Sequence, residues 1–348
     1  MWAWSEGWWG LPVTVGDEIA PLLGAPRGSV TAHGTVTLAV DVALSCLDFA
    51  GRRNRIVVPE RDFPTLHYAV RAQEGGDALV EVIPSEDPVR LDERAVCRAI
   101  DARTSLVVLS HVLFRSAWVV DVAPIVERAR ETGARVLLGV HQSAGSVPVD
   151  VTRLGVDFAG GGTLKWLCGG PGVAFLYVRP DLHGELEPAL TGWQADRAPF
   201  EFQPGAVRYR EDAWRFLNGT LNVPALQACR PGLRILRKVG GERIREKSGR
   251  QTTRLVDRAR ARGWSVTAAE EPERRGGTVA LRLPHAFEVS LELLARDVIV
   301  DYRPEAGIRV SPHFYNSDEE CDRVLEEAES VLRTGAWRSH EGAPRRIT

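Results

Sequence analysis

The sequence predicts a two-domain α/β protein, in which a mostly parallel sheet covered by helices on both faces is followed by a smaller α+β domain. The chain has 348 residues, which is too many for one ordinary hydrophobic core. Short, continuously apolar runs alternate with helix-like segments over most of its length, as in parallel sheets that are buried on both faces. Toward the C-terminus this pattern gives way to a shorter series of mixed strands and helices.

The predicted strands of the large domain are short runs rich in aliphatic and β-branched residues. They cover residues 55–58, 78–83, 105–112, 135–140 and 172–178. Helix-like segments lie between the strands, and they start at Pro64 or cover residues 91–100 and 122–132. This alternation is what indicates the parallel sheet.

The C-terminal part of the chain is predicted to begin with a long, arginine-rich helix over residues 224–262. Further strands and helices are predicted over residues 278–283, 287–296, 298–301, around Ile308 and Val310, and over 317–332. Ser317 and Glu320 have the spacing of a capping box. We place the domain boundary near Pro231. This gives a large domain (1–230, with a Trp-rich segment 1–14), a small domain (231–338) and a flexible polar tail (339–348).

Composition excludes several classes of function. The net charge of -2 predicts no general affinity for nucleic acid or for an anionic membrane, and no apolar run is long enough to span a bilayer. The cysteines are odd in number, lie far apart and form no CxxC, which favours neither a disulfide framework nor a metal site. They are Cys46, Cys97, Cys168, Cys229 and Cys321. We therefore expect a cytoplasmic protein.

Ligands of an open parallel sheet bind beyond the carboxyl ends of its strands, and three loops at such positions are unusual. Residues 136–150 read VLLGVHQSAGSVPVD, residues 156–174 read VDFAGGGTLKWLCGGPGVA, and residues 307–316 read GIRVSPHFYN. The second loop presents Lys165 between glycine-rich stretches. Because lysine is rarely buried without a partner, this position suggests a functional amine; the alternative is a surface lysine beside a turn.

The order of these motifs resembles the class V aminotransferases, and within them most closely the kynureninase-like branch. The shared series is Gln-Ser-x-Gly-x-x-Pro-x-Asp, Gly-Val-Asp-Phe-x-x-Gly-Gly, the lysine, and Gly-Gly-Pro-Gly before an apolar strand. Further matches, in the same order as in that family, are FPTLHYAV, SHVLFRSA, LTGW and IRVSPHFYNS. The resemblance covers nearly the whole chain.

This resemblance implies a fold-type I aminotransferase-like architecture with a seven-stranded type of sheet, a homodimer, and pyridoxal phosphate (PLP) as cofactor. Lys165 would form the Schiff base, since an amine in a partly desolvated pocket becomes nucleophilic. The positions that match cofactor-binding residues are Gly34, Thr35, Val36, Phe63, Gly139, Gln142, Thr163, Lys165, Asn218, Gly219 and Thr220.

The phosphate group of PLP is expected at a helix N-terminus, where free backbone N–H groups hold anions. The resemblance implies that the turn Gly34-Thr35-Val36 supplies these N–H groups. The alternative is that Thr35 serves only as a helix cap. Thr163 matches a hydroxyl that reaches the same phosphate. Residues 218–220 match a segment that a second subunit contributes, and Gln142 matches the neighbour of the phenolic oxygen.

Arg309 matches the arginine that holds the carboxylate of a small amino acid or related amine substrate, for which a bidentate guanidinium is well suited. The alternative for Arg309 is a surface ion pair. Trp193, in the LTGW motif, either lines the substrate pocket or fills an interface.

The chain departs from the family at the end of strand 135–140. Relatives carry an aspartate there that pairs with the ring nitrogen of PLP, and this chain has Gly139. His141 lies on the same face two residues later, so it either replaces that partner or occupies the space of the ring. Leu164 and Phe114 replace tyrosines. The loss of a charge-assisted contact slows carbanion chemistry by about ten- to a hundredfold, so true kynureninase activity is not expected.

Three hypotheses follow. The first is a PLP-dependent lyase, elimination or replacement enzyme with Lys165 and His141 as catalytic residues. The second is an enzyme of the same fold that has lost PLP and uses Lys165, His141 and Arg309 as acid, base and anion anchor. The third is a non-catalytic partner subunit, against which the retention of Lys165, Gln142, Thr163 and Arg309 argues.

Overall fold

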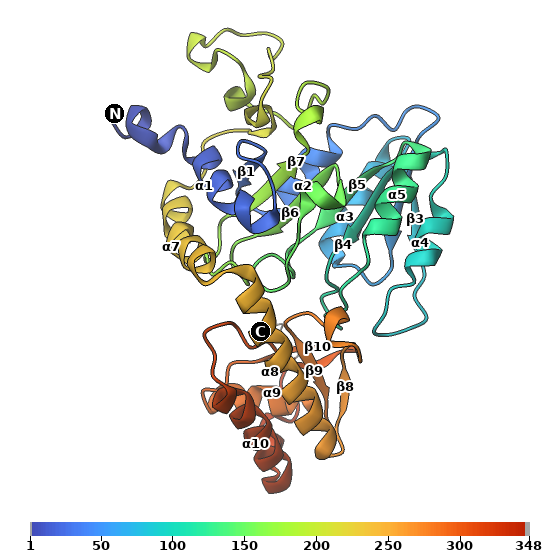
Figure 1. The fold of residues 1–348 in the computed structure, drawn as a ribbon, viewed down its shortest axis with the longest axis vertical. Coiled ribbons are helices and arrows are strands. Elements are labelled where there is room, and N and C mark those ends of the chain that lie inside the picture. The colour runs from blue at the N-terminus through green and yellow to red at the C-terminus, as the bar shows by residue number, and fades with distance from the viewer. Residues whose placement is uncertain (1, 345–348) are drawn as a thin grey trace. The chain divides into compact units, whose positions relative to one another are not determined.

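The computed structural model describes residues 2–344. Met1 and residues 345–348, the end of the predicted tail, lie outside this range. The chain forms two compact units. The large unit comprises Met1–Ser85, Asp92–His111 and Val120–Gly241, and the small unit comprises Glu86–Leu91, Val112–Val119 and Glu242–Thr348. The small unit thus takes in two segments from earlier in the chain (Figure 1).

The large unit contains a seven-stranded sheet in the order β1-β7-β6-β5-β4-β2-β3. The strands are β1 (Val30–His33), β2 (Arg55–Pro59), β3 (Leu79–Ile83), β4 (Thr104–Ser110), β5 (Arg135–Gly139), β6 (Phe158–Gly162) and β7 (Ala174–Val178). Strands β2 to β6 are mutually parallel, whereas β7 and β1 are antiparallel to their neighbours. The predicted mostly parallel sheet is confirmed.

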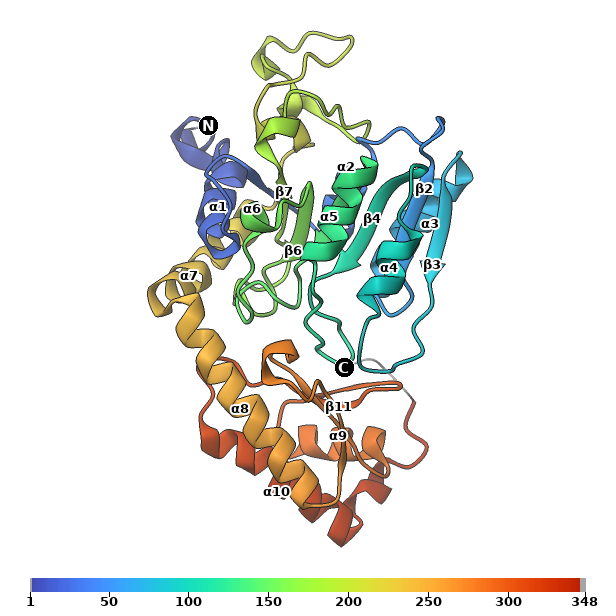
Figure 2. The ribbon, with the colours of Figure 1, turned by 45° about the vertical axis from the view of Figure 1, so that its right-hand side comes forward.

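Helices flank this sheet (Figures 1 and 2). They are α1 (Leu11–Ile19), α2 (Val36–Leu44), α3 (Pro64–Ala72), α4 (Glu93–Ala99), α5 (Ala123–Thr132), α6 (Val151–Leu154) and α7 (Val223–Val239). The apolar faces of α2 and α3 pack with alternate strand residues such as Ile56 and Val58 in one buried core. Every residue of β7 is buried, which explains its continuous apolar sequence.

The small unit has a four-stranded antiparallel sheet in the order β10-β11-β9-β8. Its strands are β8 (Ser265–Thr267), β9 (Val279–Arg282), β10 (Asp301–Arg303) and β11 (Gly307–Val310), and its helices are α8 (Gly241–Ala261), α9 (Ala286–Ala295) and α10 (Asp318–Thr334). Leu255, Leu281, Ile308 and Leu325 are fully buried in its core. The capping box predicted for Ser317 and Glu320 is present at the start of α10.

The long helix predicted over residues 224–262 is wrong in one respect, because it is two helices. The chain breaks at Gly240, whose φ of 91° lies in a region that favours glycine. Pro231, near which we placed the domain boundary, lies inside α7. The strand predicted over residues 298–301 begins only at Asp301.

One buried histidine of the large unit makes stability depend on pH. His33 is fully buried on β1, and burial lowers its pKa from 6.5 to about 4. The unfolded chain therefore takes up a proton between pH 6.5 and about 4 that the folded chain excludes, so stability falls as the pH falls through this window. We expect His33 to contribute about 3 kcal/mol to this loss.

Urea unfolding of the wild type and of His33→Asn at several pH values checks this expectation. The free energy of unfolding of the variant should depend less steeply on pH between 6.5 and about 4. Parallel pH dependences of the two proteins would show that His33 is not responsible.

Candidate active site

The carboxyl ends of four neighbouring strands bring polar side chains to one edge of the large sheet. Lys165 lies in the turn after β6, and the turn is closed by a hydrogen bond from Cys168 N to Lys165 O at 3.0 Å. His141 follows β5, and Ser110 ends β4. Asp62 follows β2, which pairs with β4.

Three elements meet at Gly162, the last residue of β6. A Cβ atom at this position would lie 2.7 Å from His141 Cε1 and 3.3 Å from Val36 Cγ2, at the start of α2. Gly162 N also donates a hydrogen bond of 2.8 Å to His141 Nδ1. The strand before Lys165, the N-terminus of α2 and the imidazole therefore share one small region, and only glycine fits at their meeting point.

His141 is electrostatically coupled to Lys165. Burial and, second, the charge of Lys165 lower the pKa of His141 to about 4. The imidazole is therefore neutral at neutral pH. Since Nδ1 accepts a hydrogen bond, the proton of the neutral ring is on Nε2, which can donate to a ligand.

The N-terminus of α2 has the donor set of an anion site. Thr35 is the N-cap and accepts a hydrogen bond from Leu38 N at 3.1 Å, so the capping interpretation of Thr35 is correct. The N–H groups of Val36 and Thr37 precede the first hydrogen bonds of the helix and can bind an anion. A Cβ atom at Gly34 would meet nothing within 4 Å, which leaves room for a phosphate group.

Thr163 is placed differently from the expectation. Its side chain is fully buried, and its hydroxyl lies 3.2 Å from Gly170 O and 3.1 Å from Val173 O. It thus contacts the backbone of the Gly-Gly-Pro-Gly turn rather than the surface where a phosphate group would bind. This geometry supports a structural role for Thr163.

The same contacts explain why glycine is needed in the Gly-Gly-Pro-Gly turn. A Cβ atom at Gly169 would lie 2.5 Å from Thr163 Cβ and 2.8 Å from Cys229 Cβ. We expect Gly169→Ala to lower the free energy of unfolding by about 1–3 kcal/mol, as overpacked cores do. Urea denaturation measures the change, with Gly184→Ala as the control because nothing lies within 4 Å of its Cβ position. Equal losses in the two variants would contradict this explanation.

The remaining predicted residues of the large unit lie in three places. Gln142 Oε1 accepts a hydrogen bond of 3.3 Å from Nε1 of Trp166, the residue that follows Lys165. Asn218 Nδ2 donates to Leu190 O at 2.8 Å, which holds the segment with Gly219 and Thr220 against the LTGW turn. Phe63 is the N-cap of α3 and is half exposed.

Trp193 belongs to an exposed aromatic cluster of the large unit. Its ring centroid lies 4.8 Å from that of Trp9, 5.8 Å from Phe200 and 6.3 Å from Phe202. Trp9 also stacks on Trp214 at 5.6 Å. The N-terminal Trp-rich segment therefore packs on residues 193–214 of its own chain.

Sequence reasoning missed the pair of Asp62 and Ser110. Asp62 is buried, and it accepts hydrogen bonds from Ser110 N at 2.8 Å, from the Ser110 hydroxyl and from Phe63 N at 3.0 Å. Burial raises the pKa of Asp62, while these hydrogen bonds and His67 oppose the rise. Ser110 stood in a quoted motif, but nothing in the sequence pointed to Asp62.

In the small unit, Arg309 is held by its neighbours on the sheet. Arg309 Nε donates to Asp301 Oδ1 at 2.7 Å, Nη2 pairs with the same carboxylate, and Nη1 donates to Phe114 O at 2.5 Å. Asp301 lies directly opposite Arg309 in the β10–β11 pair. Arg309 therefore does form an ion pair, as the alternative stated. The pair is not on the surface, however, because the Arg309 side chain is only 9% exposed. Two N–H groups of the five on the guanidinium remain for a carboxylate.

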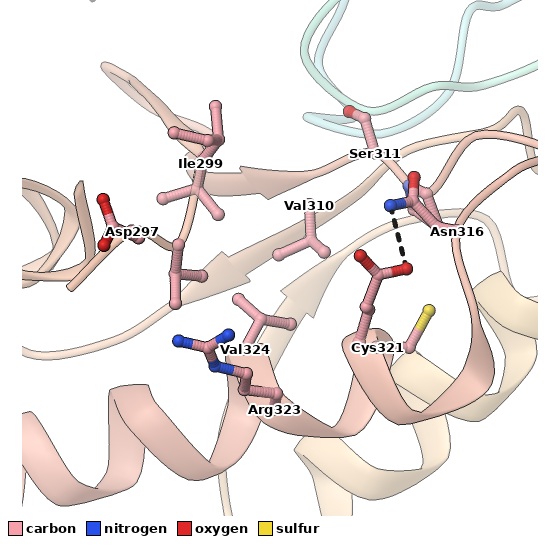
Figure 3. Close-up of a pocket in the computed structure, with 12 residues that line it drawn as sticks. Asp297, Ile299, Val310, Ser311, Asn316, Cys321, Arg323 and Val324 are labelled. Atoms are coloured by element: carbon pink, nitrogen blue, oxygen red, sulfur yellow. Dashed lines mark hydrogen bonds between the residues drawn. The ribbon is translucent and has the colours of Figure 1, made fainter.

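A cavity of about 210 Å³ in the small unit is a different site (Figure 3). Ile299, Val310 and Val324 line it, and Asn316 Nδ2 donates to Glu320 Oε2 at 3.2 Å at one end. Neighbouring residues of a strand point to opposite faces, so Val310 places this cavity on the face of β11 away from Arg309. Its lining contains none of the predicted site residues.

The fold and this arrangement of lysine, helix N-terminus and strand ends define a fold-type I enzyme of the PLP-dependent class. The family model of Aminotransferase class-V matches residues 15–324, and the chain belongs to this family. Kynureninase of Burkholderia pseudomallei (strain 1106a) is 32% identical over 98% of this chain and 83% of that protein. The uncharacterized aminotransferase YcbU of Bacillus subtilis (strain 168) is 34% identical over 89% of this chain and 81% of its own.

Solved structures confirm the fold. The apo cysteine desulfurase of Thermococcus onnurineus NA1 matches with a TM-score of 0.84 and 21% identity over 95% of this chain and 86% of that one. The cystine C-S lyase C-DES, in complex with its product cysteine persulfide, matches with a TM-score of 0.83 and 23% identity over 94% and 88% of the two chains. The chain is thus an enzyme in a PLP-dependent family with lyase-type members.

Within the described residues 2–344, no helix is both long enough and apolar enough to cross a membrane.

Proposed function

We propose that this enzyme binds PLP through Lys165 and carries out a lyase-type reaction on a small amino acid. The observation that carries the proposal is the meeting of β6, the N-terminus of α2 and His141 at Gly162. It brings an anion site to the strand that precedes the lysine. The donor set therefore fits PLP, whose phosphate group needs free N–H groups and whose aldehyde needs an amine.

When bound, PLP withdraws electrons from the α-carbon of the amino acid. The chain's own residues supply the rest. The N–H groups at the start of α2 bind the phosphate, and the amine of Lys165 holds and moves the proton of the α-carbon. His141 can donate a hydrogen bond from Nε2 to a bound ligand, because its Nδ1 already accepts one from Gly162 N. Arg309 binds the substrate carboxylate through its remaining N–H groups.

The chain offers an unusually direct test of the attachment site, since Lys165, Lys238 and Lys247 are its only lysines. The purified protein is incubated with PLP, the visible absorbance is recorded, and the imine is then reduced with borohydride. Peptide mass spectrometry should find the pyridoxyl group on Lys165 and not on the exposed Lys238. No uptake of PLP, or a label spread over the other lysines, would overturn the proposal in favour of an enzyme that has lost its cofactor.

The substrate is sought among amino acids cleaved at the β-carbon. The relatives named above motivate a panel of kynurenine, cysteine and cystine, with alanine as a substrate that has no leaving group. Turnover of a panel member that requires PLP and Lys165 would define the reaction. Absence of turnover with all of them, in PLP-loaded protein, would exclude this lyase chemistry.

We also propose that the protein is a cytoplasmic homodimer. All five cysteines are free, as in a reducing compartment. Trp8, Trp193, Phe200 and Phe202 expose large apolar surface on one unit, which a second copy would cover. Light scattering at several concentrations tests the dimer, and a monomeric mass throughout would exclude it.

A further inference from the structure

Gly139 stands where relatives carry an aspartate, and a hydroxyl group borders the space that the aspartate side chain would occupy. A Cβ atom at Gly139 would lie 3.2 Å from Ser110 Oγ, 3.5 Å from Leu66 Cδ1 and 3.6 Å from Leu109 O. Ser110 is the residue opposite Gly139 in the β4–β5 pair. The hydroxyl group is thus the nearest side-chain polar atom to the space that a residue 139 side chain would enter.

Behind this hydroxyl lies a buried carboxylate whose hydrogen-bond donors are all neutral. Asp62 is 3% exposed and accepts three hydrogen bonds, all from neutral groups of Ser110 and Phe63. Within residues 2–344 no lysine or arginine forms an ion pair with it. A buried carboxylate of this kind is costly unless a positive group or a proton compensates it.

The hydrogen-bond directions connect the carboxylate to this space beside Gly139. Ser110 Oγ donates its only proton to Asp62 Oδ1, so its lone pairs can accept a proton donor on the side of Gly139. A protonated pyridine nitrogen is such a donor, and it would bring Asp62 a positive charge that no lysine or arginine of residues 2–344 supplies through an ion pair.

We propose that Asp62, acting through the Ser110 hydroxyl, takes the place of the aspartate missing at Gly139 as the partner of the ring nitrogen of PLP. This inference rests on the proposed function. Asp62 is a positioning and charge-supplying residue, and Ser110 is the group in contact with the nitrogen. One mobile proton is shared along the chain of hydrogen bonds: with Asp62 ionised the nitrogen is protonated, and with Asp62 protonated Ser110 donates to a neutral nitrogen. No other atom is transferred.

A purely structural role is the competing explanation, because Asp62 also bonds Phe63 N at the start of α3. The test must therefore read the ring nitrogen itself. Wild type, Asp62→Asn and Ser110→Ala are loaded with PLP that carries ¹⁵N in the ring, and the ¹⁵N chemical shift is measured at neutral pH. We expect the protonated-nitrogen signal in the wild type and its loss in both variants. Ser110→Ala keeps the backbone bonds of Asp62, so it carries the test even if Asp62→Asn fails to fold.

A rescue experiment sharpens the assignment. Gly139 has no positive φ, so its backbone accepts a side chain, and removing the Ser110 hydroxyl makes room for one. Ser110→Ala/Gly139→Asp should restore the protonated nitrogen, whereas the matched Ser110→Ala/Gly139→Asn should not.

The two failures are distinguishable. If the wild type takes up no PLP on Lys165, the proposed function fails, and this inference with it. If the wild type is loaded and its nitrogen is protonated, but both single variants keep the same ¹⁵N signal, the Asp62–Ser110 assignment alone is overturned. A neutral nitrogen in the loaded wild type overturns it as well.

Discussion

Lys165→Ala is expected to abolish the visible absorbance of covalently bound PLP and to reduce turnover by about 10²–10⁴-fold or more. This range is the usual loss when one general acid–base group is removed, and the loss of covalent attachment adds to it. The variant should still bind PLP weakly, because the N-terminus of α2 remains. Steady-state rates with the best substrate of the panel and the absorbance of the dialysed protein measure the two effects.

Lys165→Arg is the control for charge, since arginine keeps the positive charge but cannot form the imine. It should be as inactive as the alanine variant. Lys238→Ala, at an exposed position, should behave like the wild type. Turnover that survives in Lys165→Ala would show that the lysine is not in the reaction path.

Arg309→Ala is expected to reduce kcat/KM by about ten- to a hundredfold, with most of the change in KM. One charge-assisted hydrogen bond to a carboxylate contributes about 1.5–3 kcal/mol, and about 1.4 kcal/mol corresponds to tenfold. Arg309→Lys should recover little, because a lysine cannot hold Asp301 and a substrate carboxylate in one plane.

Asp301→Asn separates positioning from binding. The guanidinium remains, but the carboxylate that fixes its Nε and Nη2 is neutralised, so we expect a smaller rise in KM than in Arg309→Ala. Kinetics with an amine substrate that lacks the carboxylate supply the control, since neither variant should alter its KM. A similar loss with both substrates would mean that Arg309 only stabilises the fold.

Helices and strands could be predicted from the sequence wherever a local pattern of residues decides the structure. The continuous apolar runs of β2 to β5 gave their places in the sheet, and Ser317 with Glu320 gave the start of α10. The short strands β1 and β8, of four and three residues, were not found, although β9 and β11, of four residues each, were. The break at Gly240 was overlooked although two consecutive glycines, Gly240 and Gly241, mark it in the sequence.

The residues of the site likewise fall into those that a local motif reveals and those that only the fold brings together. Lys165 and the turn before α2 could be found, because each lies in a motif of consecutive residues. Asp62 and Ser110 are 48 residues apart, and only the pairing of β2 with β4 brings them together. Thr163 matched a family position, but its hydroxyl direction depends on the backbone at Val173, which a motif does not encode.

The division of the small unit over three stretches of chain has a consequence for how the protein folds. Arg274 Nη1 bonds Val119 O across 155 residues, and Gly276 N bonds Ala117 O at 2.7 Å. These contacts close a very long loop before they return any stabilisation, which slows folding. During synthesis, residues 112–119 can therefore form these contacts only after the C-terminal part of the chain has been made. A fragment that starts at Glu242 would lack this segment, so we expect it to be a poor independent module, whether in the cell or in an engineered fusion.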